Sequence, residues 1–128
     1  MKKLTLNDYQ EKAMTTCMES SRNYSYMSGN LSAEVGELQG KVNKAQRKGL
    51  LKFREDGHIV WIGTQTDLTH FETELAKEAG DVLWQLSGLC SVMGWELEDV
   101  AQMNLDKLAA RKAVGTIDGN GDGIIRDK

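Results

Sequence analysis

Apolar residues recur at helical spacing along four stretches of the chain, and each stretch predicts an amphipathic helix. The four predicted helices cover residues 5–23, 31–47, 66–93 and 97–113. A glycine follows each of the last three, at Gly49, Gly94 and Gly115, as is usual just past a helix C terminus. Thr5 and Asp8 have the spacing of a capping box at the start of the first helix. The chain contains no proline, which permits long uninterrupted helices.

The pattern changes between the second and third predicted helices, where residues 50–65 do not fit a helix. Asp56-Gly57 lies between two short segments, 52–55 and 58–62, and an Asp-Gly pair in this position predicts a two-residue hairpin turn. Because an isolated hairpin is only marginally stable in water, it either packs on the helices as a surface loop or moves as a lid. The predicted fold is all-α, a four-helix bundle with this small β-hairpin inserted between its second and third helices.

The composition is that of one globular domain spanning residues 1–128, with a glycine- and aspartate-rich tail at 116–128. A compact chain of this size exposes about 6,800 Å² of surface. No apolar run is long enough to cross a bilayer, and no signal-peptide pattern opens the chain. Cys17 and Cys90 are far apart in the sequence, and each falls within a helical pattern. We therefore expect two free thiols in a reducing compartment. We therefore expect a cytoplasmic protein that does not contact the membrane.

Two pairs of acidic residues occupy matching positions on the second and third predicted helices. Glu34 and Glu37 form one acid-x-x-acid pair, and Glu78 and Asp81 form the other. At 100° per residue, the first acid of each pair lies just outside the apolar stripe and the second about 60° further round on the same side. If these helices pack together, four carboxylates converge and repel one another, and Mg²⁺ or Mn²⁺ would relieve that repulsion. The alternative is two ordinary acidic pairs on solvated helix faces.

The fourth predicted helix places a polar residue, Asn104, inside its apolar stripe. Lys107 and Arg111 lie along the same edge of that helix. An inward amide beside two cations suits a ligand that carries phosphate. The alternative is a core asparagine bonded to backbone, beside two cations whose aliphatic stems cover apolar surface.

The overall net charge of −3 argues against a surface built for nucleic acid, but one segment is strongly basic. This segment, residues 41–54, contains no acid and holds six of the sixteen basic residues, Lys41, Lys44, Arg47, Lys48, Lys52 and Arg54. It is a solvated face, a nucleic-acid contact, or a site for the phosphates of a nucleotide. Lys41 and Lys44 lie on the same side of their helix as Glu34 and Glu37, which is compatible with the last of these.

Three ordered motifs contain these candidate residues. They are Asn30-Leu-Ser-Ala-Glu34-Val-Gly-Glu37-Leu38, the segment 77–86 with Glu78 and Asp81, and the segment 94–111 with Asn104, Lys107 and Arg111. Together with the opening residues 8–13 and the tail 116–123, they resemble the MazG-like nucleoside triphosphate pyrophosphohydrolases over nearly the whole chain. Two departures are visible. Residues 50–65 are a longer insertion than compact members carry, and Lys77 stands where a second acid often occurs.

The resemblance implies a Mg²⁺-dependent hydrolase that cleaves a nucleoside triphosphate between its α and β phosphates, which yields a nucleoside monophosphate and pyrophosphate. It implies that Glu34, Glu37, Glu78 and Asp81 hold the metal and that Glu37 orients the attacking water. Lys107 and Arg111 would then bind phosphate oxygens, and Asn104 the sugar or a phosphate. Lys44 of the basic segment is a further candidate for binding the substrate. Related all-α pyrophosphatases that act on dUTP or phosphoribosyl-ATP share the architecture, and nothing in the sequence selects a base.

A second face of the third predicted helix bears on assembly. It carries small residues and one tryptophan, namely Ala76, Gly80, Trp84, Ser87 and Ser91. A helix with two non-polar faces needs a second partner, which is the first helix or hairpin of the same chain, or another subunit. MazG-like enzymes are usually dimers or tetramers, so the resemblance favours a homo-oligomer with Trp84 at or near the subunit contact.

Overall fold

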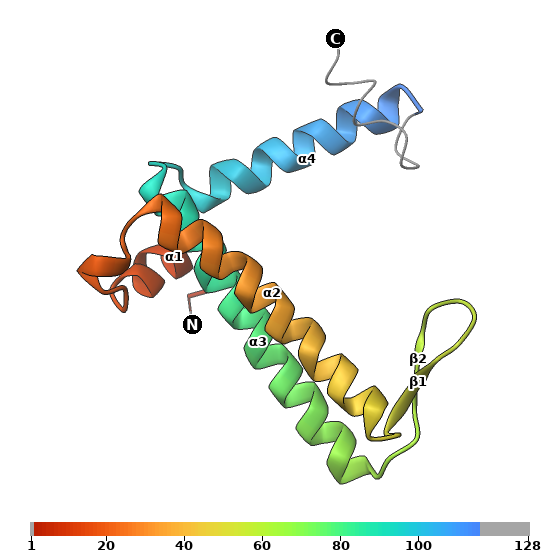
Figure 1. The fold of residues 1–128 in the computed structure, drawn as a ribbon. Coiled ribbons are helices and arrows are strands. Elements are labelled where there is room, and N and C mark those ends of the chain that lie inside the picture. Colours follow the sequence, from red (N-terminus) through yellow and green to blue (C-terminus); the bar gives the residue numbers. More distant parts are fainter. Residues whose placement is uncertain (1, 116–128) are drawn as a thin grey trace.

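The computed structural model describes residues 2–115, and the tail at 116–128 lies outside the described residues. Its helices and strands are α1 (Leu6–Met14), a short 3₁₀ turn η1 (Glu19–Ser21), α2 (Tyr24–Arg47), β1 (Leu51–Phe53), β2 (Ile59–Trp61), α3 (Gln65–Val92) and α4 (Leu97–Ala113). The predicted all-α class with a β-hairpin between two long helices is therefore confirmed. Figure 1 shows α2 and α3 side by side along most of their length, with the hairpin at one end of the pair.

The capping box of α1 is confirmed, but the predicted extent of this helix is wrong. Thr5 Oγ1 accepts from the backbone N–H of Asp8 at 3.0 Å, and the Asp8 carboxylate accepts from the backbone N–H of Thr5 at 3.5 Å. The helix nevertheless ends at Met14, and α2 begins at Tyr24, earlier than the pattern indicated. The start of α2 is fixed by Asn23, whose side chain accepts from the backbone N–H of Tyr26.

The hairpin is fixed at its base and exposed toward its turn. Leu51 pairs with Trp61 and is buried, and the Trp61 ring stacks on Phe71 of α3 with their centroids 5.3 Å apart. The indole N–H of Trp61 also donates to the backbone oxygen of Thr64 at 2.9 Å. Residues 52–59 are exposed, so the packed base, rather than the turn, ties the strands to the helices.

The core is small and lies where α1 crosses the α2–α3 pair. Ala13, Met14, Cys17 and Met27 form a buried cluster, and Trp84 packs against it. The indole N–H of Trp84 donates to the backbone oxygen of Ala13 and to Thr16 Oγ1. The partner of the second face of α3 is therefore α1 of the same chain, which corrects the expectation of Trp84 at a subunit contact.

Gly88 of α3 and Met27 of α2 form the closest approach in this core. Met27 is fully buried, and a Cβ at Gly88 would overlap its Sδ and Cε atoms, whereas a Cβ at Gly80 of the same helix meets nothing within 4 Å. We expect Gly88→Ala to lower the free energy of unfolding by about 1–3 kcal/mol, because the end of the buried Met27 side chain must shift within a packed core. Gly80→Ala, the matched control, should raise it by up to about 1 kcal/mol through helix propensity. Thermal unfolding of both variants is the measurement, and an equal effect of the two would contradict the packing.

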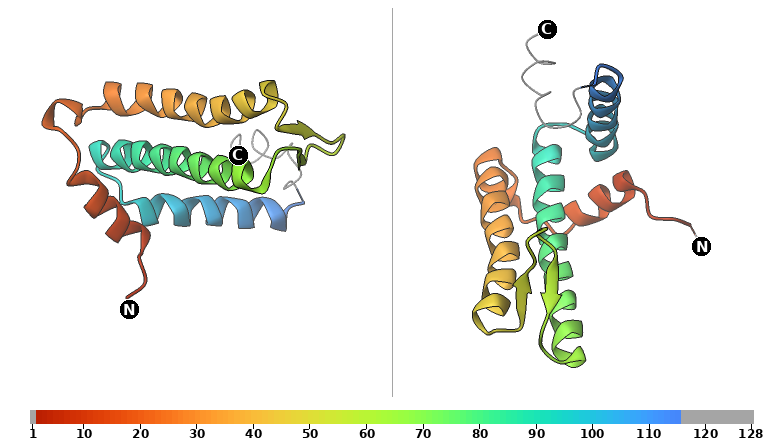
Figure 2. Two further views of the ribbon diagram at one scale, coloured as in Figure 1. Left: turned by 90° about the horizontal axis from the view of Figure 1, so that it is seen from below. Right: turned by 90° about the vertical axis from the view of Figure 1, so that its right-hand side faces the viewer.

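The helix α4 diverges from the α2–α3 pair (Figures 1 and 2). Its start is held by α1, because Gln10 Oε1 accepts from the backbone N–H of Leu97 and the Gln10 amide donates to the backbone oxygen of Trp95. Beyond this start, Met103 and Leu105 are 71% and 59% exposed. Asn104 is also exposed, so the expectation that it points into the chain's own core is wrong.

The chain exposes far more surface than a compact protein of its length. Its accessible surface is 9183 Å², against the expected value of about 6,800 Å². The helix α4 contributes to this exposure, since it makes its main contacts with α1 and not with the other long helices. No helix in residues 2–115 is long and apolar enough to cross a membrane.

Candidate metal centre

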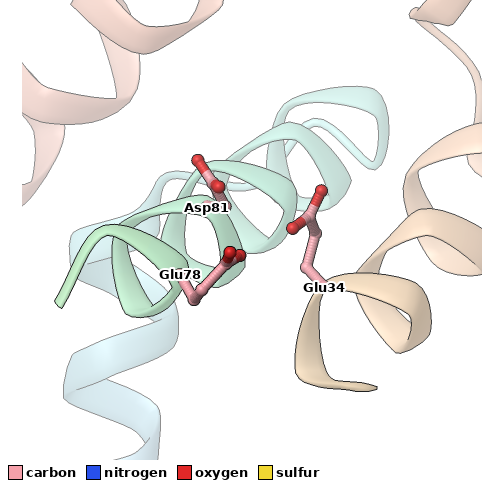
Figure 3. Close-up of side chains that lie close together, drawn as sticks. All are labelled: Glu34, Glu78 and Asp81. Atoms are coloured by element: carbon pink, nitrogen blue, oxygen red, sulfur yellow. The ribbon is translucent and has the colours of Figure 1, made fainter. Parts of the chain in front are cut away.

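Three of the four predicted carboxylates converge between α2 and α3. One oxygen each from Glu34, Glu78 and Asp81 lies within 4.8 Å of the others (Figure 3). Glu34 comes from α2, and the other two come from adjacent turns of α3, because an i, i+3 pair points to one side of a helix. Glu37 is exposed and lies outside this three-residue cluster, although it is close enough to Glu34 to influence its ionisation.

The cluster carries more negative charge than its protein neighbours neutralise. Glu34 Oε2 and Glu78 Oε2 are buried and have no hydrogen-bond partner among the residues that the structure describes. Within residues 2–115, the one ion pair that these acids form joins Lys41 Nζ to Glu78 Oε1, at 3.8 Å. Buried carboxylate oxygens without partners are costly, and several oxygen ligands at such spacing suit a hard divalent cation. The donor set therefore fits Mg²⁺ or Mn²⁺.

The ionisation of Glu34 reflects this crowding. Burial raises the pKa of its carboxyl above the ordinary value, and the nearby charges of Glu37, Asp81 and Glu78 raise it further, as does a hydrogen bond with Glu37. All three effects disfavour the charged form. In the metal-free protein the cluster therefore opposes folding once Glu34 is ionised.

We expect Glu34→Gln to raise the melting temperature of the metal-free protein at about pH 8 and to have little effect near pH 4. The pKa of Glu34 is higher in the folded state than in the unfolded state. The free-energy penalty that ionised Glu34 places on folding is therefore absent below the unfolded-state pKa and complete above the folded-state pKa. Melting curves in EDTA at both pH values measure this. Destabilisation by the variant at pH 8 would contradict the repulsion.

Tyr9 of α1 is a site neighbour that the sequence reasoning missed. Burial raises the pKa of its hydroxyl, and the charge of Asp81 raises it further. Tyr9 also packs against the buried core cluster. Its place in the apolar pattern of the first helix indicated a core residue, and only the crossing of α1 over α3 brings its ring toward Asp81.

The three predicted phosphate-binding residues of α4 are not brought to the carboxylates by their own chain. Asn104 and Lys107 are exposed and Arg111 is buried, all on the helix that diverges from α2 and α3. Their contact with phosphate stays a prediction. Because α4 points away from the carboxylates of its own chain, these residues would reach a carboxylate cluster most readily in a neighbouring subunit.

Lys44 lies instead further along the same pair of helices, in a pocket of about 200 Å³ between the C-terminal half of α2 and the N-terminal half of α3. We call this the lysine pocket. Its lining residues are Lys41, Lys44, Ala45, Lys48, Leu50, Asp67, His70, Phe71 and Glu74. Lys41 belongs to both the pocket and the metal centre, since its ammonium reaches Glu78.

With this geometry in view, the chain can be assigned to a family. Residues 22–115, which contain α2, the hairpin, α3 and α4, match the family model described as the MazG nucleotide pyrophosphohydrolase domain. The chain therefore belongs to the MazG family of nucleotide pyrophosphohydrolases, hydrolases that act on nucleotides.

One curated relative gives an independent comparison. The "Gene 37 protein" of Mycobacterium phage L5 is 36% identical over 104 residues, which cover 81% of this chain and 79% of the relative. Its printed name states no activity. No solved structure matches the chain.

Proposed function

We propose that the protein hydrolyses a nucleoside triphosphate between the α and β phosphates, with Mg²⁺ or Mn²⁺, to a nucleoside monophosphate and pyrophosphate. The observation that carries this is the convergence of Glu34, Glu78 and Asp81 with two buried, unpartnered oxygens, in a chain of the MazG family. Membership of the MazG family favours a hydrolase that acts on nucleotides over nucleic-acid binding by the basic segment 41–54.

The residues divide the work of such a reaction. Glu34, Glu78 and Asp81 hold the metal, which when bound supplies a more acidic water and neutralises charge on the phosphates. Glu37, exposed one turn from Glu34, accepts a hydrogen bond from the attacking water and orients it. Lys44 binds phosphate oxygens from the lysine pocket, and Lys107, Arg111 and Asn104 bind substrate from α4.

The assembly we propose is a homo-oligomer, a dimer or tetramer formed through α4. The helix α4 supports this, since it diverges from the other long helices and makes its main contacts with α1 alone. Met103 and Leu105 are exposed on this helix, and Val114 is exposed directly after its last residue. A second copy can cover these side chains through a symmetric contact, because every copy presents the same helix.

Incubation with each common ribo- and deoxyribonucleoside triphosphate, with Mg²⁺ or with EDTA, tests the proposed function. Chromatography of the products should show a monophosphate and pyrophosphate from at least one substrate, only when metal is present. Release of orthophosphate with a diphosphate as first product would disprove cleavage between the α and β phosphates.

A further inference from the structure

The lysine pocket has a cationic wall whose charge the protein does not neutralise. Lys41, Lys44 and Lys48 lie within about 60° of one another on α2, at spacings where like charges repel. Lys41 pairs with Glu78, but neither Lys44 nor Lys48 forms an ion pair with any described residue. Of the pocket's two acids, Glu74 already pairs with Lys77 at 3.6 Å, which leaves the single charge of Asp67 against those of Lys44 and Lys48. The wall therefore favours an anionic ligand.

The pocket continues directly from the metal centre. Along α2, Lys41 lies about 6 Å beyond Glu37, and Lys44 about 10 Å beyond it, by helical rise. Lys41 Nζ is 3.8 Å from Glu78 Oε1, so one ammonium lies at the boundary between the two sites. An extended anion held at the carboxylates by metal can thus reach Lys44 without leaving the protein surface.

The other walls fit a compact polyanion better than a flat base. Phe71 lines the pocket, but its ring is stacked on Trp61, which covers part of its aromatic surface. His70 adds a polar ring on the side of α3. The cavity of about 200 Å³ is small for a nucleoside and adequate for two linked phosphoryl groups.

We propose that the lysine pocket binds the β and γ phosphoryl groups of the substrate, and hence the pyrophosphate product, while the nucleoside lies on the opposite side of the metal centre. This inference rests on the proposed function for its substrate, and it adds the direction in which the triphosphate lies. Lys44 and Lys48 contact the leaving pyrophosphoryl group, and Lys41 bridges it to the carboxylates.

Calorimetry with the two product classes tests this direction. Pyrophosphate and the four common nucleoside monophosphates are titrated into the full-length chain in Mg²⁺. We expect Lys44→Ala and Lys48→Ala each to weaken pyrophosphate binding about tenfold, with less than about a twofold change for any monophosphate. Lys52→Ala, which removes an exposed lysine of β1 outside the pocket, is the matched control and should change neither affinity.

Several outcomes would overturn the inference: no pyrophosphate binding by the wild type, unchanged binding by both pocket variants, or monophosphate binding weakened as much as pyrophosphate binding. A chain that hydrolyses no nucleotide yet binds pyrophosphate through Lys44 and Lys48 would disprove the proposed function and support the pocket. A chain that hydrolyses a nucleoside triphosphate, but whose affinity for pyrophosphate does not depend on these lysines, would support the proposed function and disprove the pocket. Circular dichroism of each variant confirms that the fold is retained.

Discussion

Asp81→Asn is expected to abolish nucleotide turnover while leaving the helical fold intact. Loss of a charged ligand removes roughly 4 kcal/mol of transition-state stabilisation, which corresponds to about a thousandfold in kcat. The fold should survive because Asp81 is exposed and belongs to a cluster of mutually repelling acids. The rate of pyrophosphate release, together with circular dichroism, measures both parts of this expectation.

Glu72→Gln is the matched control for that experiment. Glu72 is an exposed acid of the same helix, nine residues from Asp81 and so about 180° round the helix axis. It should keep the wild-type rate. A second readout separates metal binding from other roles: Mg²⁺ should raise the melting temperature of the wild type and of Glu72→Gln, but much less that of Asp81→Asn. An active Asp81→Asn enzyme, or one that melts at a lower temperature without metal, would contradict the metal role.

Met103→Glu is expected to dissociate the proposed oligomer. Burial of an unpaired charge in a subunit contact costs about 3–5 kcal/mol, so the dissociation constant should rise more than about a hundredfold. Light scattering at micromolar concentration should give a multiple of 14.2 kDa for the wild type and a mass near that of one chain for the variant.

Met18→Glu is the control for assembly, because Met18 is 70% exposed, almost as much as Met103, but precedes η1 and lies outside α4. It should assemble as the wild type does. A wild-type mass of one chain, or the same assembly state in the Met103→Glu variant, would disprove a contact through α4. Since Met103 makes little contact within its own chain, circular dichroism distinguishes lost assembly from lost folding.

Local sequence signals determined much of this protein. The capping box at Thr5 and the glycines after the long helices are set by short-range geometry, and the structure reproduces them. The hairpin around Asp56-Gly57 is also present, but the predicted two-residue turn is wrong, because the last strand pair is Phe53 with Ile59 and residues 54–58 lie between the strands. The acid pairs could also be placed on their helices, because an i, i+3 spacing fixes which side of a helix both residues share. Their matching offsets from two apolar stripes predicted that the carboxylates converge if the two helices pack together.

Only the tertiary structure decided which groups meet. A helical pattern fixes the angle of a residue round its own axis, but not the tilt or height of one helix against another, and so Glu37 lies outside the cluster while Tyr9 approaches Asp81. Likewise, an apolar stripe shows that a face needs cover without showing what covers it. The face around Trp84 is covered by α1, whereas α4 diverges with Met103 exposed, because Gln10 fixes the start of α4 in that direction.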